Sequence, residues 1–231
     1  MITEESISGL RRDSRTNSRL RFGVPNQGRL LNQVRAALAF SEWTQDTRCL
    51  NFAVGDVEAV LARSTDLPRL VAAGVLDGCI TGRDYVVEAG VEEHLEEVLD
   101  LNFQATSICV VARNSEPAPL ARDGRDGLTV VSQYPAIARR WLDEKSQQGL
   151  IDHATFIAID GAAEMYVHTG LADLAIDAVM TGRSLRDNDM VVLETLFAST
   201  GRVYSRGEDL LGVKKHRLLS SLAATLADGT S

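Results

Sequence analysis

The segment from Asp173 to Leu185 holds the side chains best suited to chemistry. Its apolar run 174–176 is typical of a short strand that is buried on both faces. Asp177 follows near the carboxyl end of that strand, and the loop 181–184 then supplies two hydroxyls, a glycine and an arginine. Successive backbone N–H groups in such a loop can close on phosphate oxygens, with a cation beside them. The segment predicts either a sugar-phosphate site or an ordinary polar turn.

Composition excludes several classes of partner. The 231 residues are 45% hydrophobic and 24% charged, as in ordinary globular proteins, and the net charge of −8 argues against nucleic acid or an acidic membrane surface. No apolar run approaches the roughly 20 residues of a membrane span, and the start lacks the apolar core of a signal peptide. The three cysteines are widely spaced in apolar surroundings, which indicates buried thiols and a cytoplasmic location. The four histidines show no metal-binding spacing.

Strand-like and helix-like segments alternate along the chain, which predicts an α/β fold with a largely parallel sheet. We expect strands at 20–24, 50–54, 76–80, 98–101, 107–112, 128–131, 156–159, 174–176, 191–196 and 201–204. Residues 1–19 predict a poorly ordered leader, and an apolar helical face predicts a tail helix over 209–226. The polar stretch 114–127 predicts a surface connection and suggests a division into two lobes.

Polar turns follow five of the predicted strands. Ligands of open α/β sheets bind at the carboxyl ends of strands, so these turns together predict a ligand cleft. The turns are 26–29, 82–84, 132–135, 160–164 and 177–185. From its neighbouring residues alone, Arg29 could equally be a solvated charge at a helix start. Arg83 and Asp84 could likewise form a surface ion pair.

In their order and spacing, these turns resemble the ATP phosphoribosyltransferase family. Val24–Leu30 (VPNQGRL) looks like the family's opening Pro-Asn-Lys-Gly-Arg-Leu. Arg63 with Asp66-Leu67-Pro68, and then 74–84, is similar to the second block of the family. The later matching segments are Tyr134-Pro135, Asp160-Gly161-Ala162 with Glu164, 170–173, and Asp177 with Thr181-Gly182-Arg183-Ser184-Leu185. The resemblance covers about residues 20–206.

The resemblance implies two periplasmic-binding-protein-like lobes with a cleft between them. Lobe 1 would comprise residues 20–103 and 198–231, and lobe 2, which would bind phosphoribosyl pyrophosphate (PRPP), residues 104–197. It also implies the reaction, in which N1 of the ATP adenine attacks the anomeric carbon of PRPP and pyrophosphate leaves. Magnesium would accompany the substrate phosphates rather than occupy a protein site. The reaction would open histidine biosynthesis.

The resemblance also implies roles for particular residues. The loop 177–185 would hold the 5-phosphate of PRPP, Asp177 would face the ribose hydroxyls, and arginines from lobe 1 would gather polyphosphate charge. The implied catalytic residues are Asp177, Glu164 and Arg29. The implied substrate-binding residues are Arg63, Arg83, Asp84, Tyr134, Gly161, Ala162, Asp173, Thr181, Gly182, Arg183 and Ser184.

The chain departs from the family pattern at several positions. Gln27 replaces the lysine of the opening motif, Met165-Tyr166 stands where many members have Ala-Pro, and Asp189-Met190 where Gly-Leu is frequent. We expect a short form without the C-terminal regulatory domain, which implies a homo-oligomer and a separate regulatory subunit. A paralogue from a coformycin-type nucleoside pathway is a further hypothesis. The alternative from another class is a non-catalytic small-molecule binding module, because the fold is shared with solute receptors.

Overall fold

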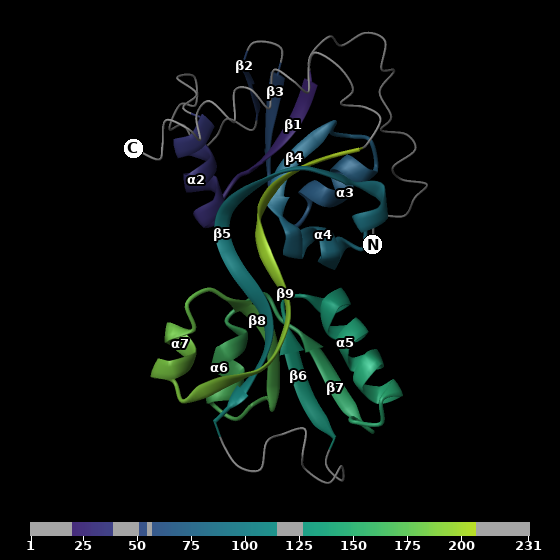
Figure 1. Ribbon diagram of the computed structural model, residues 1–231, viewed down its shortest axis with the longest axis vertical. Helices are drawn as coiled ribbons and strands as arrows, with labels where there is room; N and C mark the ends of the chain where they lie inside the picture. Colours follow the sequence, from purple (N-terminus) through teal and green to yellow (C-terminus); the bar gives the residue numbers. More distant parts are fainter. Residues whose placement is uncertain (1–19, 39–50, 55–56, 115–126, 207–231) are drawn as a thin grey trace. The chain divides into compact units, whose positions relative to one another are not determined.

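The computed structural model describes residues 20–38, 51–54, 57–114 and 127–206. The predicted leader, the tail helix, Cys49 and most of the polar connection lie outside these residues. The chain divides into two compact units. Unit 1 contains the described residues up to Gln104 and from Thr200 onward, and unit 2 contains Ala105–Ser199 (Figure 1). The boundaries expected from the family resemblance, 103/104 and 197/198, lie beside these.

Unit 1 is built on a sheet with the strand order β2-β3-β1-β4-β9. β1 (Leu20–Pro25) pairs in parallel with β3 (Val57–Ala62) and β4 (Gly78–Gly82). β2 (Asn51–Val54) is antiparallel to β3, and the last residues of β9 (Met190–Ser205) are antiparallel to β4. The helices are α2 (Gly28–Leu38), α3 (Leu67–Ala72) and α4 (Arg83–Ala89), and a 3-10 turn, η1, spans Glu92–His94. Each of the three parallel strands therefore leads through a turn toward a helix.

The two faces of the unit 1 sheet carry different helices (Figure 1). Alternating β1 side chains, including Phe22 and Val24, pack in one cluster with Leu30 and other residues of α2. Residues of α3 and α4 form the second cluster with Leu76 and Cys79. Gly23 faces this second cluster, where an added Cβ would lie only 2.4 Å from Leu67 Cδ2. Glycine is required at this position because a helix packs directly against the strand backbone.

Unit 2 is built on the strand order β9-β5-β8-β6-β7. β6 (Leu128–Ser132) pairs in parallel with β7 (Ala154–Ala158) and β8 (Leu174–Val179), whereas β5 (Glu96–Arg113) is antiparallel to β8. α5 (Pro135–Gln147) covers one face, and α6 (Ala163–His168) and α7 (Arg183–Asp187) cover the other (Figure 1). The run 174–176 is fully buried, as its apolar sequence predicts.

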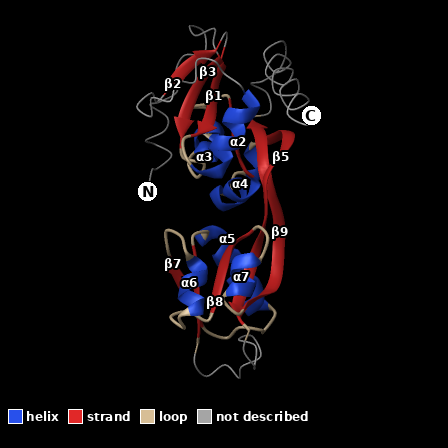
Figure 2. Cartoon of the chain, turned by 90° about the vertical axis from the view of Figure 1, so that its left-hand side faces the viewer, coloured by secondary structure: helices blue, strands red, loops and turns tan. Residues whose placement is uncertain are grey.

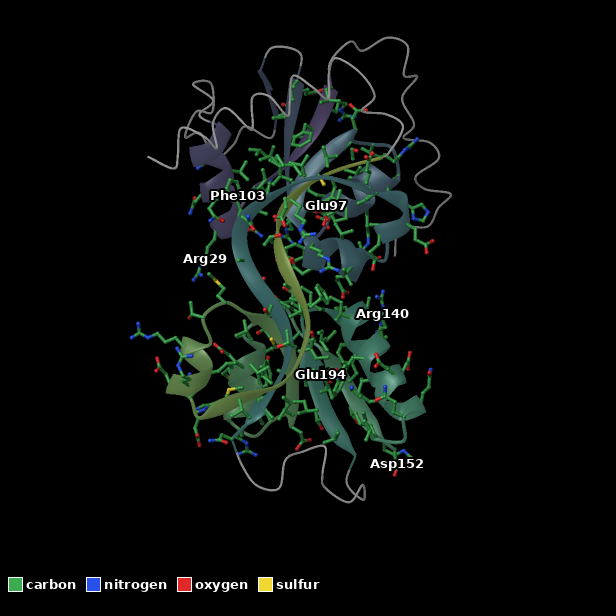
Figure 3. All side chains as sticks on the ribbon, in the orientation of Figure 1. Arg29, Glu97, Phe103, Arg140, Asp152 and Glu194 are labelled. Carbon is green, nitrogen blue, oxygen red and sulfur yellow. The ribbon has the colours of Figure 1, made fainter. Side chains whose placement is uncertain are left out.

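A polar clamp connects α5 to β9 in unit 2. Glu194, labelled in Figure 3, lies on β9. It accepts hydrogen bonds from Trp141 Nε1 at 2.9 Å and from Lys145 Nζ at 3.2 Å. The Trp141 side chain is otherwise buried in the core, so its indole N–H needs such an acceptor. The clamp connects the middle of α5 to β9.

The long strands β5 and β9 run side by side and contribute residues to both units (Figure 2). The sequence pattern predicted two separate strands in each of these regions, and the structure joins them. Asn102 and Gln104 keep positive φ angles of 54° and 48° inside β5, just before the unit boundary. The polar stretch 114–127 does not itself separate the two units, because β6 and the end of β5 both belong to unit 2.

None of the described helices is long and apolar enough to cross a membrane. Cys79 and Cys109 are both buried free thiols, as predicted.

Candidate active site

The turns after β6, β7 and β8 lie at one edge of unit 2. Ser132 is in register with Ala158 on one side and with Ile176 on the other, and all three strands run parallel. Their carboxyl ends therefore meet, and the turn residues that follow them are neighbours. This edge carries most of the residues that the sequence analysis assigned to a sugar-phosphate site.

Asp177 is the acidic group at the centre of this edge. It is partly buried in β8, and its Oδ1 accepts hydrogen bonds from the Ala178 N–H at 2.7 Å and from Gln133 Nε2 at 3.2 Å. Burial raises the pKa of Asp177 above its ordinary value, and the charge of Glu164 adds to the rise, whereas the two hydrogen bonds lower the pKa. Asp177 is therefore a carboxylate whose negative charge is only partly compensated.

The loop 181–184 follows β8 and leads into α7. Ser184 Oγ donates a 2.7 Å hydrogen bond to Glu164 Oε1, which connects this loop to the start of α6. Arg186 Nη1 donates to the Thr181 carbonyl at 3.1 Å, so the loop closes on itself. Arg183 remains largely exposed and forms a 3.5 Å ion pair with Asp187. The loop therefore presents hydroxyls and a cation to solvent, and its own hydrogen bonds hold its backbone in place.

The turn before Glu164 has an unusual backbone. Gly161 has φ 138°, and Ala162 has φ 54°, a left-handed value that side-chain-bearing residues seldom adopt. An added Cβ at Gly161 would lie 3.9 Å from Gln133 Oε1. The turn therefore passes close to Gln133 and directs α6, with Glu164 in its first turn, toward the loop 181–184.

Two residues of the predicted set do not belong to this surface. Asp173 precedes β8 and lies at the opposite edge, where its carboxylate accepts the Thr129 N–H at 2.9 Å. Tyr134 is only 2% exposed, so its ring lies in the interior of unit 2. The family motif includes both residues, but here Asp173 closes the start of a strand and Tyr134 fills the core.

Unit 1 has a corresponding edge at the ends of β1, β3 and β4. Pro25 is in register with Ala62, and the Asn26 N–H donates to the Ala62 carbonyl at 2.9 Å. Thr81 Oγ1 donates to the Ser64 carbonyl at 3.0 Å, which joins the turns after β3 and β4. These turns bring the three predicted arginines to one edge. They are Arg29, at the start of α2 (Figure 3), Arg63, after β3, and Arg83, at the start of α4.

The exposure of the residues differs along this edge. Arg29 and Arg63 are exposed, as is Gln27, whereas Arg83 is partly buried. Asp84 is 7% exposed, and its Oδ1 would lie 2.2 Å from a Cβ at Gly82, so glycine gives this carboxylate its space. Among the described residues, no group of three or more His, Cys, Asp or Glu side chains could hold a metal ion.

A family model described as ATP phosphoribosyltransferase matches residues 63–227. The chain belongs to the ATP phosphoribosyltransferase family. The ATP phosphoribosyltransferase of Methanopyrus kandleri is 32% identical over 212 residues, which cover 89% of this chain and 72% of that protein. The enzyme of Methanocaldococcus jannaschii is 27% identical over 209 residues, which cover 89% and 71%.

Solved structures show the same fold. An ATP phosphoribosyl transferase (HisG:HisZ) complex from Thermotoga maritima matches with a TM-score of 0.73 at 21% identity, over 90% of this chain and 99% of that chain. The alkanesulfonate-binding protein SsuA from Xanthomonas axonopodis pv. citri matches with a TM-score of 0.53 at 14% identity. The match covers 90% of this chain and 73% of that chain. The predicted α/β fold of the periplasmic-binding-protein type is confirmed.

Gln133, which contacts the central acid, was not assigned a role in the sequence analysis. Gln133 directly follows β6, and the parallel register of β6 and β8 places it beside Asp177. The sequence did contain a signal for a role of Gln133, because Ser132 and Gln133 are the first two polar residues after the predicted strand 128–131. Local sequence patterns do not reveal the order of the strands in the sheet, and it is this order that makes β6 and β8 neighbours.

Proposed function

We propose that this protein joins N1 of the ATP adenine to the anomeric carbon of PRPP and releases pyrophosphate. The reaction would be the first step of histidine biosynthesis. The observation that carries the proposal is the grouping of Asp177, Glu164 and the loop 181–184 at one edge of unit 2, in a chain of this family. The carboxylates and the hydroxyl-bearing loop together suit a phosphorylated sugar, which presents a phosphate and hydroxyls to the same surface.

The chemistry requires no protein nucleophile. The N1 lone pair forms the new N–C bond while the bond from the anomeric carbon to pyrophosphate breaks, and that electron pair leaves with pyrophosphate. The anomeric carbon inverts and carries positive character at the transition state. The protein contributes by holding the two substrates in line and by stabilising separated charge.

In unit 2, the loop 181–184 would hold the 5-phosphate of PRPP. The Thr181 and Ser184 hydroxyls and the loop amides would donate to its oxygens, and Gly182 allows the backbone to approach closely. Ser184 now donates to Glu164, so the phosphate would replace a carboxylate as the acceptor of this hydroxyl. Glu164 would then be released toward the sugar or the adenine, beside Gly161 and Ala162.

Asp177 would accept hydrogen bonds from the ribose hydroxyls. An ionised carboxylate accepts these bonds more strongly than a protonated carboxyl group does, so turnover should fall as the pH drops through the pKa of Asp177. Because burial raises that pKa, the acid limb of the pH profile should lie above the ordinary range of an aspartate.

In unit 1, Arg29, Arg63 and Arg83 would neutralise polyphosphate charge, with Asp84 beside them. Guanidinium groups pair with phosphates through two parallel hydrogen bonds and stay charged at all physiological pH values. Gln27 lies on the same turn as Arg29 and supplies no charge, so the arginines carry a larger share of this work than in members with lysine there.

Magnesium would reach the site on the phosphates of the substrates. Mg²⁺ dehydrates reluctantly, keeps several waters and commonly binds together with substrate phosphates rather than in an all-protein cage. When bound, the ion would reduce the charge on the departing pyrophosphate.

The test of the proposal is a turnover assay with PRPP, ATP and magnesium that measures pyrophosphate and identifies the nucleotide by mass. Phosphoribosyl-ATP as product would support the proposal. A chain that binds neither PRPP nor ATP but binds an amino acid or a similar solute would contradict it and favour the binding-module alternative. That alternative is raised by the likeness in fold to a solute-binding protein.

Two further parts of the proposal concern partners and pathway. We propose a cytoplasmic homo-oligomer that works with a separate regulatory subunit, as the name of the similar Thermotoga maritima complex suggests. Stimulation of turnover by that subunit, with co-elution in gel filtration, would support this. Complementation of a histidine auxotroph that lacks the enzyme would support histidine biosynthesis. Failure to complement by a chain with full activity in vitro would favour the coformycin-type pathway.

A further inference from the structure

The two oxygens of Asp177 differ in their surroundings. Both hydrogen bonds to its side chain, from the Ala178 N–H and from Gln133 Nε2, end on Oδ1. Within the part of the chain that the structure describes, no hydrogen-bond donor reaches Oδ2. A carboxylate can accept about four hydrogen bonds, so Oδ2 keeps its full capacity. Asp177 is therefore anchored through one oxygen and open at the other.

Gln133 is itself held in place from both sides. Ser132 Oγ donates a 2.7 Å hydrogen bond to the Ile176 carbonyl and accepts the Tyr134 N–H at 2.9 Å. Ser132 is completely buried and Tyr134 is 2% exposed, so the backbone around Gln133 has little freedom. The fold thus presents the Gln133 amide to Asp177 from the central strand of the three that form this edge.

The same glutamine also borders the turn after β7. Its Oε1 is 3.9 Å from the place of a Cβ at Gly161, while its Nε2 is bonded to Asp177. The side chain therefore stands between the carboxylate and the turn that leads to Glu164. An amide suits this place because it donates to Asp177 without adding charge, whereas a carboxylate or a lysine would change the ionisation of the acid.

We infer that Gln133 is a positioning residue, which anchors Oδ1 of Asp177 and so reserves Oδ2 for a hydroxyl of the sugar phosphate. The inference rests on the proposed function, because it assigns the open oxygen to that substrate. Gln133 acts through Asp177. Its loss should lower the rate of the reaction, because only the Ala178 N–H would then hold the Asp177 carboxylate in its orientation.

The first experiment observes the anchor directly, without substrate. The side-chain carbons of aspartate are labelled with ¹³C in the full chain, and Asp177 is assigned from the signal that Asp177→Asn removes. In Gln133→Leu the pKa of Asp177 should rise, because the lost hydrogen bond favours the ionised form. The ionisable groups that face Asp177 are Glu164 from α6 and Cys109, its partner on β5, and neither is changed. An unchanged pKa would overturn the inference.

The second experiment measures the effect on the reaction. Gln133→Leu should lower kcat/KM for PRPP about tenfold or more, as expected for a lost hydrogen bond to a charged group. The acid limb of its pH profile should move to higher pH. A matched control is Gln148→Leu, because Gln148 also donates to a carboxylate, that of Glu144, but at the exposed far end of α5. Equal kcat/KM and equal pH profiles in wild type and Gln133→Leu would overturn the inference.

An isosteric variant separates positioning from packing. Gln133→Glu keeps the shape, and its protonated form can still donate to Asp177 Oδ1, whereas its ionised form repels the acid. Activity should therefore survive at low pH and be lost as the pH rises through the pKa of the new pair, giving an alkaline limb that wild type lacks. A pH-independent loss would indicate a packing role and overturn the inference. If wild type shows no transfer at all, the proposed function fails, and the ¹³C titration still decides whether the anchor exists.

Discussion

The carboxyl-end edges of the two units are built alike but differ in the charged groups that they gather. In each, three neighbouring parallel strands lead through turns toward helices, and hydrogen bonds join the turns. The unit 1 edge gathers Arg29, Arg63 and Arg83, of which two are exposed. The unit 2 edge holds a partly buried carboxylate, Asp177, with Glu164 near it.

Under the proposed function, one construction would serve two tasks. Exposed arginines can follow a flexible polyphosphate, and their long side chains need no exact placement. A carboxylate that must accept from sugar hydroxyls works only in a fixed orientation, so it lies in a strand and is anchored by neighbours. The cost is a raised pKa, because burial disfavours the charged form. Changes at the unit 2 edge should therefore have larger effects than changes at the unit 1 edge.

The largest effect is expected from Asp177→Ala. Loss of the oriented acceptor should lower kcat/KM by about a hundredfold or more, the scale of a lost transition-state hydrogen bond. Turnover is measured in the assay described above, with circular dichroism to verify folding. The matched control is Asp173→Ala at the other end of β8, which should cost stability through the Thr129 hydrogen bond but leave kcat/KM nearly unchanged. Equal losses of activity in both variants would contradict the assignment.

A smaller effect is expected at the unit 1 edge from Arg63→Ala. Loss of one charge-assisted contact should raise the KM for a polyphosphate substrate about tenfold, with less effect on kcat. Arg69→Ala is the control, because Arg69 is also an exposed arginine of unit 1 but lies on α3, beyond the turn. If the two variants have the same KM, Arg63 does not contact the substrate.

The gain from an added charge should be smaller still. Gln27→Lys restores the lysine of the family motif at an exposed position, where a new charge contributes about 0.2–1 kcal/mol. The dissociation constant for pyrophosphate, measured by calorimetry, should fall by roughly 1.4- to 5-fold, and the gain should shrink at high salt. A gain that is insensitive to salt would show that the lysine does not act through its charge.

The smallest effect is expected on stability, and its sign is opposite to that on activity. The folded-state pKa of Asp177 is raised, so its contribution to stability is present at pH values below the ordinary pKa of 3.8 and is lost as the pH rises through the folded-state pKa. Asp177→Asn avoids this loss. Its Tm should exceed that of wild type at pH 7, and the difference should shrink toward acid pH. A lower Tm at pH 7 would show that the ionised carboxylate stabilises the fold.

Local sequence patterns were sufficient for much of the fold. The apolar run 174–176 is a fully buried strand, and polar turns do follow the parallel strands at both edges. The patterns failed where a strand continues through polar residues. β5 continues through Asn102 and Gln104, and β9 includes the segment 197–200, so the passage between the units has no composition signal.

For the candidate site, the sequence by itself determined which residue types are present and in which turns. Asp177, Glu164 and the loop 181–184 could be named because a motif and a strand end are local features. Tertiary structure alone decided which residues lie next to these groups. Strand order and register place Gln133 beside Asp177 and Asp173 beside Thr129, because contacts between strands join residues that are more than 40 positions apart. Packing of the helix and sheet buries Tyr134.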